Sequence, residues 1–324
     1  MFSNNSINPD FRVSVVVALF NKFDYIAECL HSIEKSTENW CEIIIVDDGS
    51  TDGSFEIAEE FVKRCSRARI FRHSNNKNMG VSASRNLGIC MSKGQYLAFL
   101  DADDVMLPNR FKKTLKILRE YPVLDGVVEA VDLMFDKDSD ADDWVFSRKI
   151  LGADAAINTD KFLEALFDGR CLPQTASITV TKSLIEKVGM YNEGLRLSED
   201  FHLWLRLMAV GNFKSLGFDH VVARYRRHSG NTWTPSAFDS FRDLDIIADV
   251  LGWAKLNRSV LNSGSESALR RAFVAKYDYS IDLARTIKNR SMGLRATWVL
   301  ISAHPYAAFR RRFVKNLTFL LLKL

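Results

Sequence analysis

Residues Tyr96–Val105 read YLAFLDADDV, an apolar run that ends in three carboxylates, those of Asp101, Asp103 and Asp104. A short, continuously apolar run of this kind is typical of a strand that is buried in a sheet. Two chemistries use a cluster of carboxylates at a strand end. In one, the carboxylates hold a divalent cation against a diphosphate. In the other, the first Asp is a phosphoryl-accepting nucleophile beside Mg2+.

The segments around this run alternate between strand and helix patterns. VSVVVALF at 13–20 and EIIIVDD at 42–48 predict two further buried strands. NKFDYIAECLHSIEK at 21–35 has the periodicity of an amphipathic helix, with Asp24 as its expected N-cap, and NRFKKTLKILRE at 109–120 predicts another helix. Strands and helices alternating at this spacing predict an α/β fold with an open, mostly parallel, Rossmann-like sheet flanked by helices.

Polar side chains follow three of the predicted strands. They are Asn21, the pair Asp47–Asp48, and the cluster Asp101–Asp104. Ligands of open parallel sheets bind beyond the carboxyl ends of the strands. Because those ends lie along one edge of a parallel sheet, we expect the three groups to come together and to form a binding site.

From Gly126 onward the alternation changes. GVVEAVDLMF at 126–135 predicts one strand, and DKDSDADD at 136–143 predicts a solvated acidic loop. VVARYRRHSGN at 221–231 predicts a strand that runs into a polar loop, and beyond Pro235 the pattern is helical to the end. We therefore predict one large domain over residues 11–235 and a helical, basic C-terminal region over residues 236–324.

The charges are distributed unevenly along a chain whose net charge is only +4. From residue 241 onward there are 15 Lys and Arg against 6 Asp and Glu, and no acid follows Asp282. The last segment, ATWVLISAHPYAAFRRRFVKNLTFLLLKL at 296–324, mixes these bases with apolar residues, as interfacial helices do. We expect it to contact an anionic membrane surface, with a helix packed on the domain or a dimer contact as alternatives. Nucleic acid is not an expected partner, since no nucleic-acid-binding motif accompanies the charge.

Cysteines and the N-terminal sequence predict the compartment. The five cysteines are odd in number and include no C-x-x-C pair, which favours free thiols in a reducing environment over disulfides or a zinc site. The first 20 residues have neither a basic start nor a small-residue cleavage motif. We expect a cytoplasmic protein that is at most peripheral on the inner face of the cell membrane.

Four blocks of the sequence resemble, in order and spacing, the signature blocks of family 2 glycosyltransferases, which have the GT-A fold. The resemblance extends over residues 11–230, and its blocks are VSVVVALFNKFDYIAECLHSI at 13–33, EIIIVDDGSTDGS at 42–54, NMGVSASRNLGICMSKGQYLAFLDADDVMLP at 78–108 and SEDFHLWLRL at 198–207. It implies a nucleotide-binding half over residues 11–120 and an acceptor-binding half over residues 121–235.

The resemblance also implies a reaction. The protein is expected to be an inverting, metal-dependent hexosyltransferase that takes a sugar from a nucleotide-sugar donor, expected to be UDP-linked. The acceptor is expected to be a hydroxyl of a glycan or of a lipid-linked molecule, in the synthesis of surface polysaccharide, lipopolysaccharide or wall glycan. Mn2+ or Mg2+ is the expected cofactor.

Roles for individual residues follow from the matched blocks. The donor-binding residues are expected to be Ala18, Phe20, Asn21, Asp47, Asp48, Arg85, Asp101 and Asp103. Within this set, Asp47 or Asp48 accepts from the uracil, Arg85 faces the base or the diphosphate, and Asp101 contacts ribose or sugar. Asp103 and His228 are the expected metal ligands, and Arg224, Arg226 and Arg227 are expected to pair with phosphate. The role of Asp104 stays open.

Asp200, in the last block, resembles the catalytic base of the family. Inverting transfer needs a group that takes the proton of the acceptor hydroxyl as it attacks, and the transition state is expected to resemble an oxocarbenium ion. In the first turn of a helix, the helix dipole keeps a carboxylate ionised and ready for this role. The simpler alternative is that Asp200 and Glu199 only complement that dipole.

Two other functions remain open for the whole chain. DADDV also satisfies the Asp-x-Asp-x-Val signature of haloacid-dehalogenase-like phosphatases, in which the first Asp is the nucleophile. That signature belongs on the first strand of its fold, whereas two strand–helix units precede it here. The second alternative is a non-catalytic sugar-binding scaffold that has kept the GT-A fold.

Overall fold

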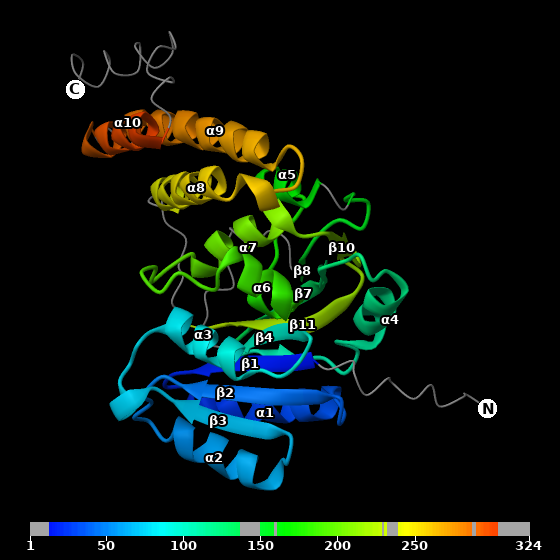
Figure 1. Cartoon of the computed structure of the whole chain (residues 1–324). Coiled ribbons are helices and arrows are strands. Elements are labelled where there is room, and N and C mark those ends of the chain that lie inside the picture. The colour runs from blue at the N-terminus through cyan, green and yellow to red at the C-terminus, as the bar shows by residue number, and fades with distance from the viewer. Residues whose placement is uncertain are drawn as a thin grey trace. The chain divides into compact units, whose positions relative to one another are not determined.

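The computed structural model describes residues 13–136, 150–158, 161–228, 230–231, 239–286 and 290–303 (Figure 1). Contacts divide the chain into two compact units. The first consists of the residues up to Asp200 together with Gly211–Asn231, and the second of Phe201–Val210 together with the residues from Thr232 onward. This division separates Phe201–Val210, part of one helix, from the residues before it. It does not test the predicted domain limits at residues 120, 235 and 236, which stay a prediction.

A seven-stranded sheet is the centre of the first unit. Its strand order is β10-β6-β9-β4-β1-β2-β3, and only β9 runs antiparallel to its neighbours. The bounds are β1 Val13–Leu19, β2 Cys41–Asp47, β3 Ala68–Arg72, β4 Tyr96–Asp101, β6 Gly126–Val128, β9 Ile178–Thr181 and β10 Phe213–Ser215. The prediction of an open, mostly parallel sheet is confirmed.

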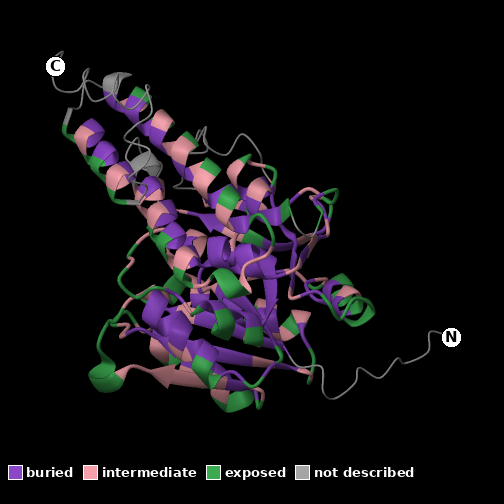
Figure 2. Cartoon of the chain, turned by 45° about the horizontal axis from the view of Figure 1, so that its top comes forward, coloured by how far each residue is buried: buried purple, intermediate pink, exposed green. Residues whose placement is uncertain are grey.

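The helices of the first unit cover both faces of this sheet. Their bounds are α1 Phe23–Ser36, α2 Ser54–Arg64, α3 Val81–Met91, α4 Lys112–Glu120, α5 Phe162–Phe167, α6 Lys182–Val188 and the start of α7, Glu199–Val210. Short 3-10 turns occur at Ser74–Asn76 and Thr175–Ser177. Figure 2 shows the buried residues concentrated on the strands and on the inner sides of the helices.

Successive side chains of β1 point to opposite faces of the sheet, and each face packs against different helices. The odd-numbered residues, such as Val15 and Val17, share a core cluster with the apolar faces of α1 and α2. The even-numbered Val16 faces α3 on the other side, where a Cβ added to Gly88 would lie only 2.4 Å from its Cγ1. Glycine at 88 therefore lets α3 approach the sheet closely, and α3 carries Arg85, one of the predicted site residues.

A second, four-stranded sheet has the order β5-β11-β7-β8. Its strands are β5 Val105–Met106, β7 Ala130–Phe135, β8 Ile150–Leu151 and β11 Val221–Arg227. The prediction of one strand over 126–135 is wrong, because the chain leaves the first sheet after Val128 and enters the second at Ala130. Glu129, the residue between them, is fully buried and forms an ion pair with the equally buried Arg110.

The start of α1 differs from its prediction in one detail. Asp24 lies in the first turn and is not the cap. The start of α2 and the loop before it cap the helix instead, because the backbone N–H of Lys22 donates to Ser54 Oγ (2.7 Å) and that of Phe23 donates to Asp52 Oδ2 (3.0 Å). Donors at a helix N-terminus need such partners, and here they come from residues about thirty positions away.

The second unit is helical. Its helices are the rest of α7, α8 Asp239–Leu256, α9 Ser265–Thr286 and α10 Arg290–Ala303, with a 3-10 turn at Arg258–Val260. Ala209 of α7 accepts hydrogen bonds from the backbone N–H of Asn262 and the hydroxyl of Ser265. A helical C-terminal region was predicted and is present over its described part. None of the helices within the described ranges is both long and apolar enough to span a membrane.

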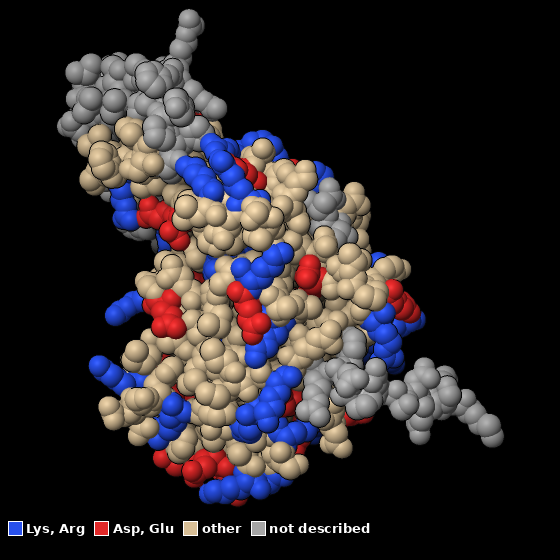
Figure 3. Space-filling view, viewed as in Figure 1, with Lys and Arg blue, Asp and Glu red and all other residues tan. Residues whose placement is uncertain are grey.

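Charged side chains of both signs are interspersed on the face of the molecule in Figure 3. The acids therefore do not gather into one patch on this face. The acids that matter for the site are instead at the end of the main sheet, where several are buried.

The Arg110–Glu129 ion pair gives a test of the junction between the two sheets. Glu129→Gln keeps the shape but leaves a buried guanidinium without its counter-charge, which costs about 3–5 kcal/mol when a buried pair is broken. We expect the free energy of unfolding, measured by urea titration with circular dichroism, to fall by that amount. The control is Glu120→Gln in the exposed Lys116–Glu120 pair (3.8 Å), which should cost less than about 1 kcal/mol. Equal effects of the two changes would contradict this account.

Candidate active site

The three polar groups predicted to come together do share one edge of the main sheet. β1 lies between β2 and β4, and both neighbours are parallel to it. In register, Leu19 pairs with Asp47 on one side and Ala18 pairs with Asp101 on the other. The carboxyl ends of three adjacent strands therefore form an acidic edge, which we call the acidic rim and define as Asp47, Asp48, Asp101, Asp103 and Asp104.

At the end of β2, both acids already accept bonds from the protein. Asp47 is fully buried and accepts from Arg72 Nε (2.9 Å). Asp48 accepts from the backbone N–H groups of Met79 (2.7 Å) and Gly80 (2.9 Å). The two acids thus hold the loops around the predicted uracil site, and a uracil would have to share their oxygens. Gly49 follows them at a φ of +82°, where a Cβ would lie 2.5 Å from the backbone oxygen of Asn76.

At the end of β1, the structure places Ala18 inside the sheet and Phe20 at the surface, with 44% of its area exposed. Asn21 has a positive φ of 49° and joins β1 to the loop after β2. Its side-chain oxygen accepts from the backbone N–H of Thr51 (2.9 Å), and its own N–H donates to Ser50 Oγ (3.0 Å). An exposed aromatic ring beside an ordered polar loop is a suitable surface for a nucleobase.

Arg85 connects two of the sequence blocks. Its guanidinium donates to Asp101 Oδ1 at the end of β4 (2.7 Å) and to Glu199 Oε1 at the start of α7 (2.8 Å). The side chain is 5% exposed. Burial alone would lower the pKa of Arg85, but the nearby negative charges, with Asp101 foremost, outweigh it and raise that pKa well above its usual range. The predicted contact of Arg85 with base or diphosphate stays a prediction.

Asp200 lies next to this junction, in the first turn of α7. The residue before the helix, Ser198, has a φ of +59°, a region that non-glycine residues rarely adopt. Backbone of this kind is concentrated at functional sites. The charge of Asp200 also contributes, after burial, to raising the pKa of Tyr191, whose ring lies beneath the Arg85 guanidinium. The side chain of Asp200 is partly exposed.

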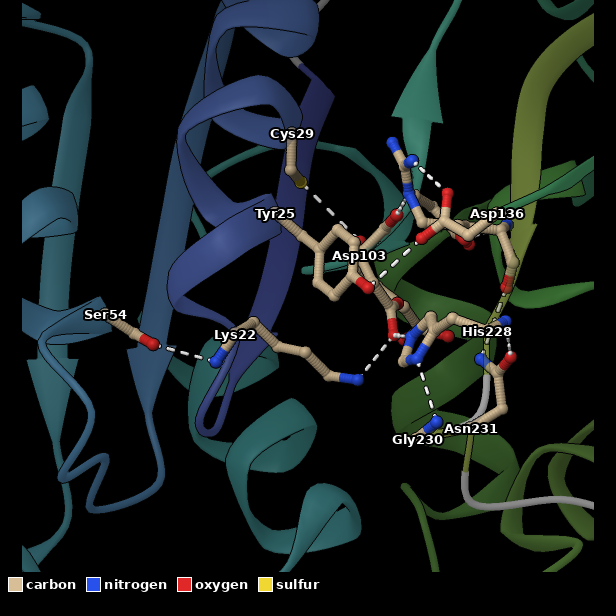
Figure 4. A network of polar contacts seen from close by, with 12 residues as sticks. Lys22, Tyr25, Cys29, Ser54, Asp103, Asp136, His228, Gly230 and Asn231 are labelled. Carbon is tan, nitrogen blue, oxygen red and sulfur yellow. Dashed lines mark hydrogen bonds and ion pairs between the residues drawn. The ribbon is translucent and has the colours of Figure 1, made fainter. Parts of the chain in front are cut away.

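Asp103 accepts from two basic side chains (Figure 4). Its Oδ2 atom accepts from Lys22 Nζ (2.6 Å) and from His228 Nε2 (3.0 Å). Burial would raise the pKa of Asp103, but the hydrogen bond from His228 and the charge of Lys22 lower it overall. The predicted metal ligands Asp103 and His228 are thus in contact. Lys22 is a further member of the site that the sequence analysis missed, although it directly follows Asn21.

His228 is held in place on several sides. Its ring stacks on Tyr25 with centroids 4.8 Å apart, and its backbone N–H donates to Asn231 Oδ1 (2.6 Å). The Nδ1 atom accepts from the backbone N–H of Gly230 (3.1 Å), so the ring proton is on Nε2 and points to Asp103. Ligation of a metal through Nε2 would require that proton to leave.

Asp104 has a structural partner. Its Oδ1 accepts from the backbone N–H of Arg226 in β11 (2.9 Å), which ties the rim to the second sheet. Burial together with the charges of Asp103 and Asp101 raises the pKa of Asp104 well above its ordinary value. A carboxyl that is fully buried and disfavoured as an anion is suited to holding the loop rather than to binding a cation.

Arg226 is committed to protein partners. Its guanidinium pairs with Glu28 of α1 and with Asp136 (2.9 Å), and it lies over the Tyr25 ring, 5.1 Å from the centroid. Tyr25 also donates to Asp136 (3.1 Å). Asp136 was assigned to a solvated acidic loop, and the structure shows it half-buried in this network instead. Only its position at the end of an apolar run distinguished it from the acids that follow, which lie outside the described residues.

The side chains present fit a divalent cation that arrives with a nucleotide. Within the described part of the chain, no three His, Cys, Asp or Glu side chains form a closed cage for a metal. Mg2+ and related ions at nucleotide sites take only one or two ligands from the protein and the others from phosphates and water. Asp103 supplies one carboxylate ligand, and His228 beside it offers a nitrogen ligand.

Comparisons with known proteins find glycosyltransferases. The family model described as Glycosyl transferase family 2 matches residues 14–167. The chain is 31% identical over 211 residues to the glycosyltransferase GlyG of Streptococcus pneumoniae serotype 4, which covers 57% of this chain and 69% of GlyG.

Two solved structures have a similar fold. S. aureus TarS 1–349, in complex with UDP-GlcNAc, has a TM-score of 0.68 and 17% identity, covering 90% of this chain and 81% of that one. The mannosyltransferase PcManGT from Pyrobaculum calidifontis, in complex with GDP-Man and Mn2+, has a TM-score of 0.55 and 14% identity, covering 96% of this chain and 80% of that one. The shared fold is the GT-A fold, and together with the family match and the identity to GlyG it shows that the chain belongs to the family 2 glycosyltransferases.

Proposed function

We propose that this glycosyltransferase moves a sugar from a UDP-linked donor, with inversion and with the help of Mn2+ or Mg2+, to a hydroxyl of a glycan or lipid-linked acceptor. The observation that carries the proposal is the double ion pair of Arg85. It joins Asp101 at the donor end of the sheet to Glu199, the neighbour of Asp200. Side chains therefore join the proposed donor-holding edge to the first turn of α7, which also carries Asp200, the carboxylate proposed as base.

Structural relatives support the choice of donor and metal. TarS binds UDP-GlcNAc and PcManGT binds GDP-Man with Mn2+. For this chain, we assign the nucleoside to the surface formed by Phe20 and Asn21, with Asp48 and Asp47 behind them. The diphosphate then lies towards Asp103, and the sugar towards Asp101 and Arg85.

The chemistry is a displacement at the anomeric carbon. Asp200 takes the proton from the acceptor hydroxyl as its oxygen attacks from the face opposite the diphosphate. Its place in the first turn of α7 favours the ionised form that accepts a proton. Arg85 fixes the neighbouring Glu199, so that the start of the helix is held relative to the end of β4. When bound, the metal ion supplies charge stabilisation to the departing diphosphate, and Asp103 with His228 would hold it.

The acceptor and the location complete the proposal. We assign acceptor binding to residues 121–235 and a role in surface polysaccharide, lipopolysaccharide or wall-glycan synthesis. The basic segment beyond residue 303, which carries Arg310, Arg311 and Arg312, lies outside the described residues. On α10, Trp298 is 69% exposed, which supports peripheral contact with a membrane surface, since tryptophan prefers such interfaces. The cytoplasmic location stays a proposal with it.

We expect Asp200→Asn to reduce transfer by about 100- to 10,000-fold, the usual contribution of a general base, while nucleotide binding stays unchanged. Transfer is measured as UDP release from a panel of UDP-sugars in the presence of cell-envelope extract, and binding as the thermal shift with UDP.

Glu56→Gln is the matched control for Asp200→Asn. Glu56 is an exposed acid in the first turn of α2, so its loss removes a dipole-complementing charge without touching the rim. If Asp200→Asn behaves like Glu56→Gln, with transfer near the wild-type rate, then Asp200 is not the base and only complements the dipole.

A second prediction concerns the donor. A UDP-sugar with Mn2+ should raise the melting temperature, because a ligand at 100 times its Kd adds about 2.7 kcal/mol of stability. Chelation with EDTA or the change Asp103→Asn should remove most of this shift.

The thermal shift and an assay of phosphomonoester hydrolysis separate the proposed transferase from the scaffold and the phosphatase. If no nucleotide sugar shifts the melting temperature with Mn2+, the non-catalytic scaffold is favoured. Hydrolysis of a phosphomonoester that survives Asp103→Asn but is lost in Asp101→Asn would favour the Asp-nucleophile phosphatase.

A further inference from the structure

Lys22 occupies a position that the proposed reaction does not yet explain. Its ammonium lies 2.6 Å from Asp103 Oδ2, the oxygen that also accepts from His228 (Figure 4). The Lys22 side chain is 22% exposed and that of Asp103 is 9% exposed. A partly buried charge pair of this length is a charge-assisted hydrogen bond, roughly twice as strong as a neutral one.

The backbone of Lys22 is fixed, whereas its side chain has one anchor. The backbone N–H is held by Ser54 Oγ (2.7 Å) at the start of α1. Among the described residues, Asp103 is the only ion-pair partner of the ammonium. His228, in contrast, is held by Tyr25, Gly230 and Asn231 as well. Of the two donors on Asp103 Oδ2, Lys22 is therefore the one that is free to leave.

We propose that Lys22 is a resident cation of the donor site, which competes with the divalent ion for Asp103 and thereby makes metal binding depend on the nucleotide. The proposal rests on the proposed function, in which Asp103 is a metal ligand. It assigns Lys22 a role in coupling the two ligands rather than in the chemical step.

Without nucleotide, Lys22 opposes the binding of a metal at Asp103. Asp103 Oδ2, the oxygen that faces the other expected ligand His228, already has two donors, which is as many as the lone pairs of one oxygen accept. A divalent ion that binds this oxygen has to displace the ammonium and then remains close to its positive charge. Like charges at such short distances in a partly buried site repel strongly. Metal binding without nucleotide is therefore weakened by Lys22.

The nucleotide reverses the sign of this effect. A diphosphate brings negative charge to the same place, and the flexible four-carbon stem of lysine lets the ammonium turn from Asp103 to a phosphate oxygen. Lys22 then stabilises the bound nucleotide, and the oxygen of Asp103 becomes available to the metal. Because coupling between two ligands is reciprocal, the metal strengthens nucleotide binding by the same factor as the nucleotide strengthens metal binding.

The test is isothermal titration calorimetry of the full chain with three titrations: Mn2+ alone, UDP alone, and Mn2+ with saturating UDP. The variants are Lys22→Met, Asp103→Asn and the control Lys35→Met. Lys35 is in the last turn of α1, the helix that Lys22 directly precedes, carries the same charge and is exposed. Lys22→Gln serves as a second variant, and the melting temperature without ligand verifies that each variant is folded.

We expect Lys22→Met and Lys22→Gln to tighten Mn2+ binding alone by about tenfold or more and to weaken UDP binding alone. The factor by which UDP strengthens Mn2+ binding should fall at least about tenfold from its wild-type value. Lys35→Met should leave all three titrations at wild-type values. An Mn2+ affinity that becomes measurable only in the Lys22 variants also supports the proposal.

Other outcomes would overturn it, and they distinguish it from the proposed function. If Asp103→Asn abolishes Mn2+ binding with UDP while the Lys22 variants bind Mn2+ alone as the wild type does, Lys22 does not compete and the metal site stands. The proposal is also overturned if Mn2+ alone binds too weakly to measure in both the wild type and the Lys22 variants. If Asp103→Asn binds Mn2+ with UDP as well as the wild type, the metal site itself is elsewhere.

Discussion

Five carboxylates lie at one edge of the main sheet, and the need to compensate their charge governs much of the surrounding structure. Without partners, like charges this close would repel each other in a poorly solvated place. Each acid has a different hydrogen-bond or ion-pair partner. The partners are Arg72 for Asp47, two backbone N–H groups for Asp48, Arg85 for Asp101, Lys22 with His228 for Asp103, and the backbone of Arg226 for Asp104.

These partners come from parts of the chain that are far apart in sequence, so the rim also joins separate elements. Arg85 ties α3 to the start of α7, and Arg226 ties the second sheet to the end of β4. The second sheet thus has a direct connection to the donor side of the site. Asp103 accepts from Lys22, which precedes α1, and from His228, which follows β11, so a cation that binds there meets a carboxylate that already has two donors.

Much of the fold could be predicted from local patterns, and most of the partners could not. The apolar runs of β1, β2 and β4 are continuous, and the rule that parallel strands end together was enough to predict the rim. The break at Glu129 gave no such signal, because a buried acid inside an apolar run is visible only with its partner Arg110. Likewise Asp52, rather than Asp24, caps α1, since the cap depends on a loop brought close by the sheet. Lys22 was missed for the same reason: Asp103 is 81 positions away.

The strand order also has a consequence for synthesis on the ribosome. β1 to β4 are complete once residue 101 has emerged, but β9, which covers the free side of β4, begins only at Ile178. At typical synthesis rates this interval is on the order of ten seconds. During that time the strand that leads to the acidic rim has an open, apolar edge, the kind of surface that pairs with other chains. The synthesis of β9 removes this open edge, because β9 then pairs with β4.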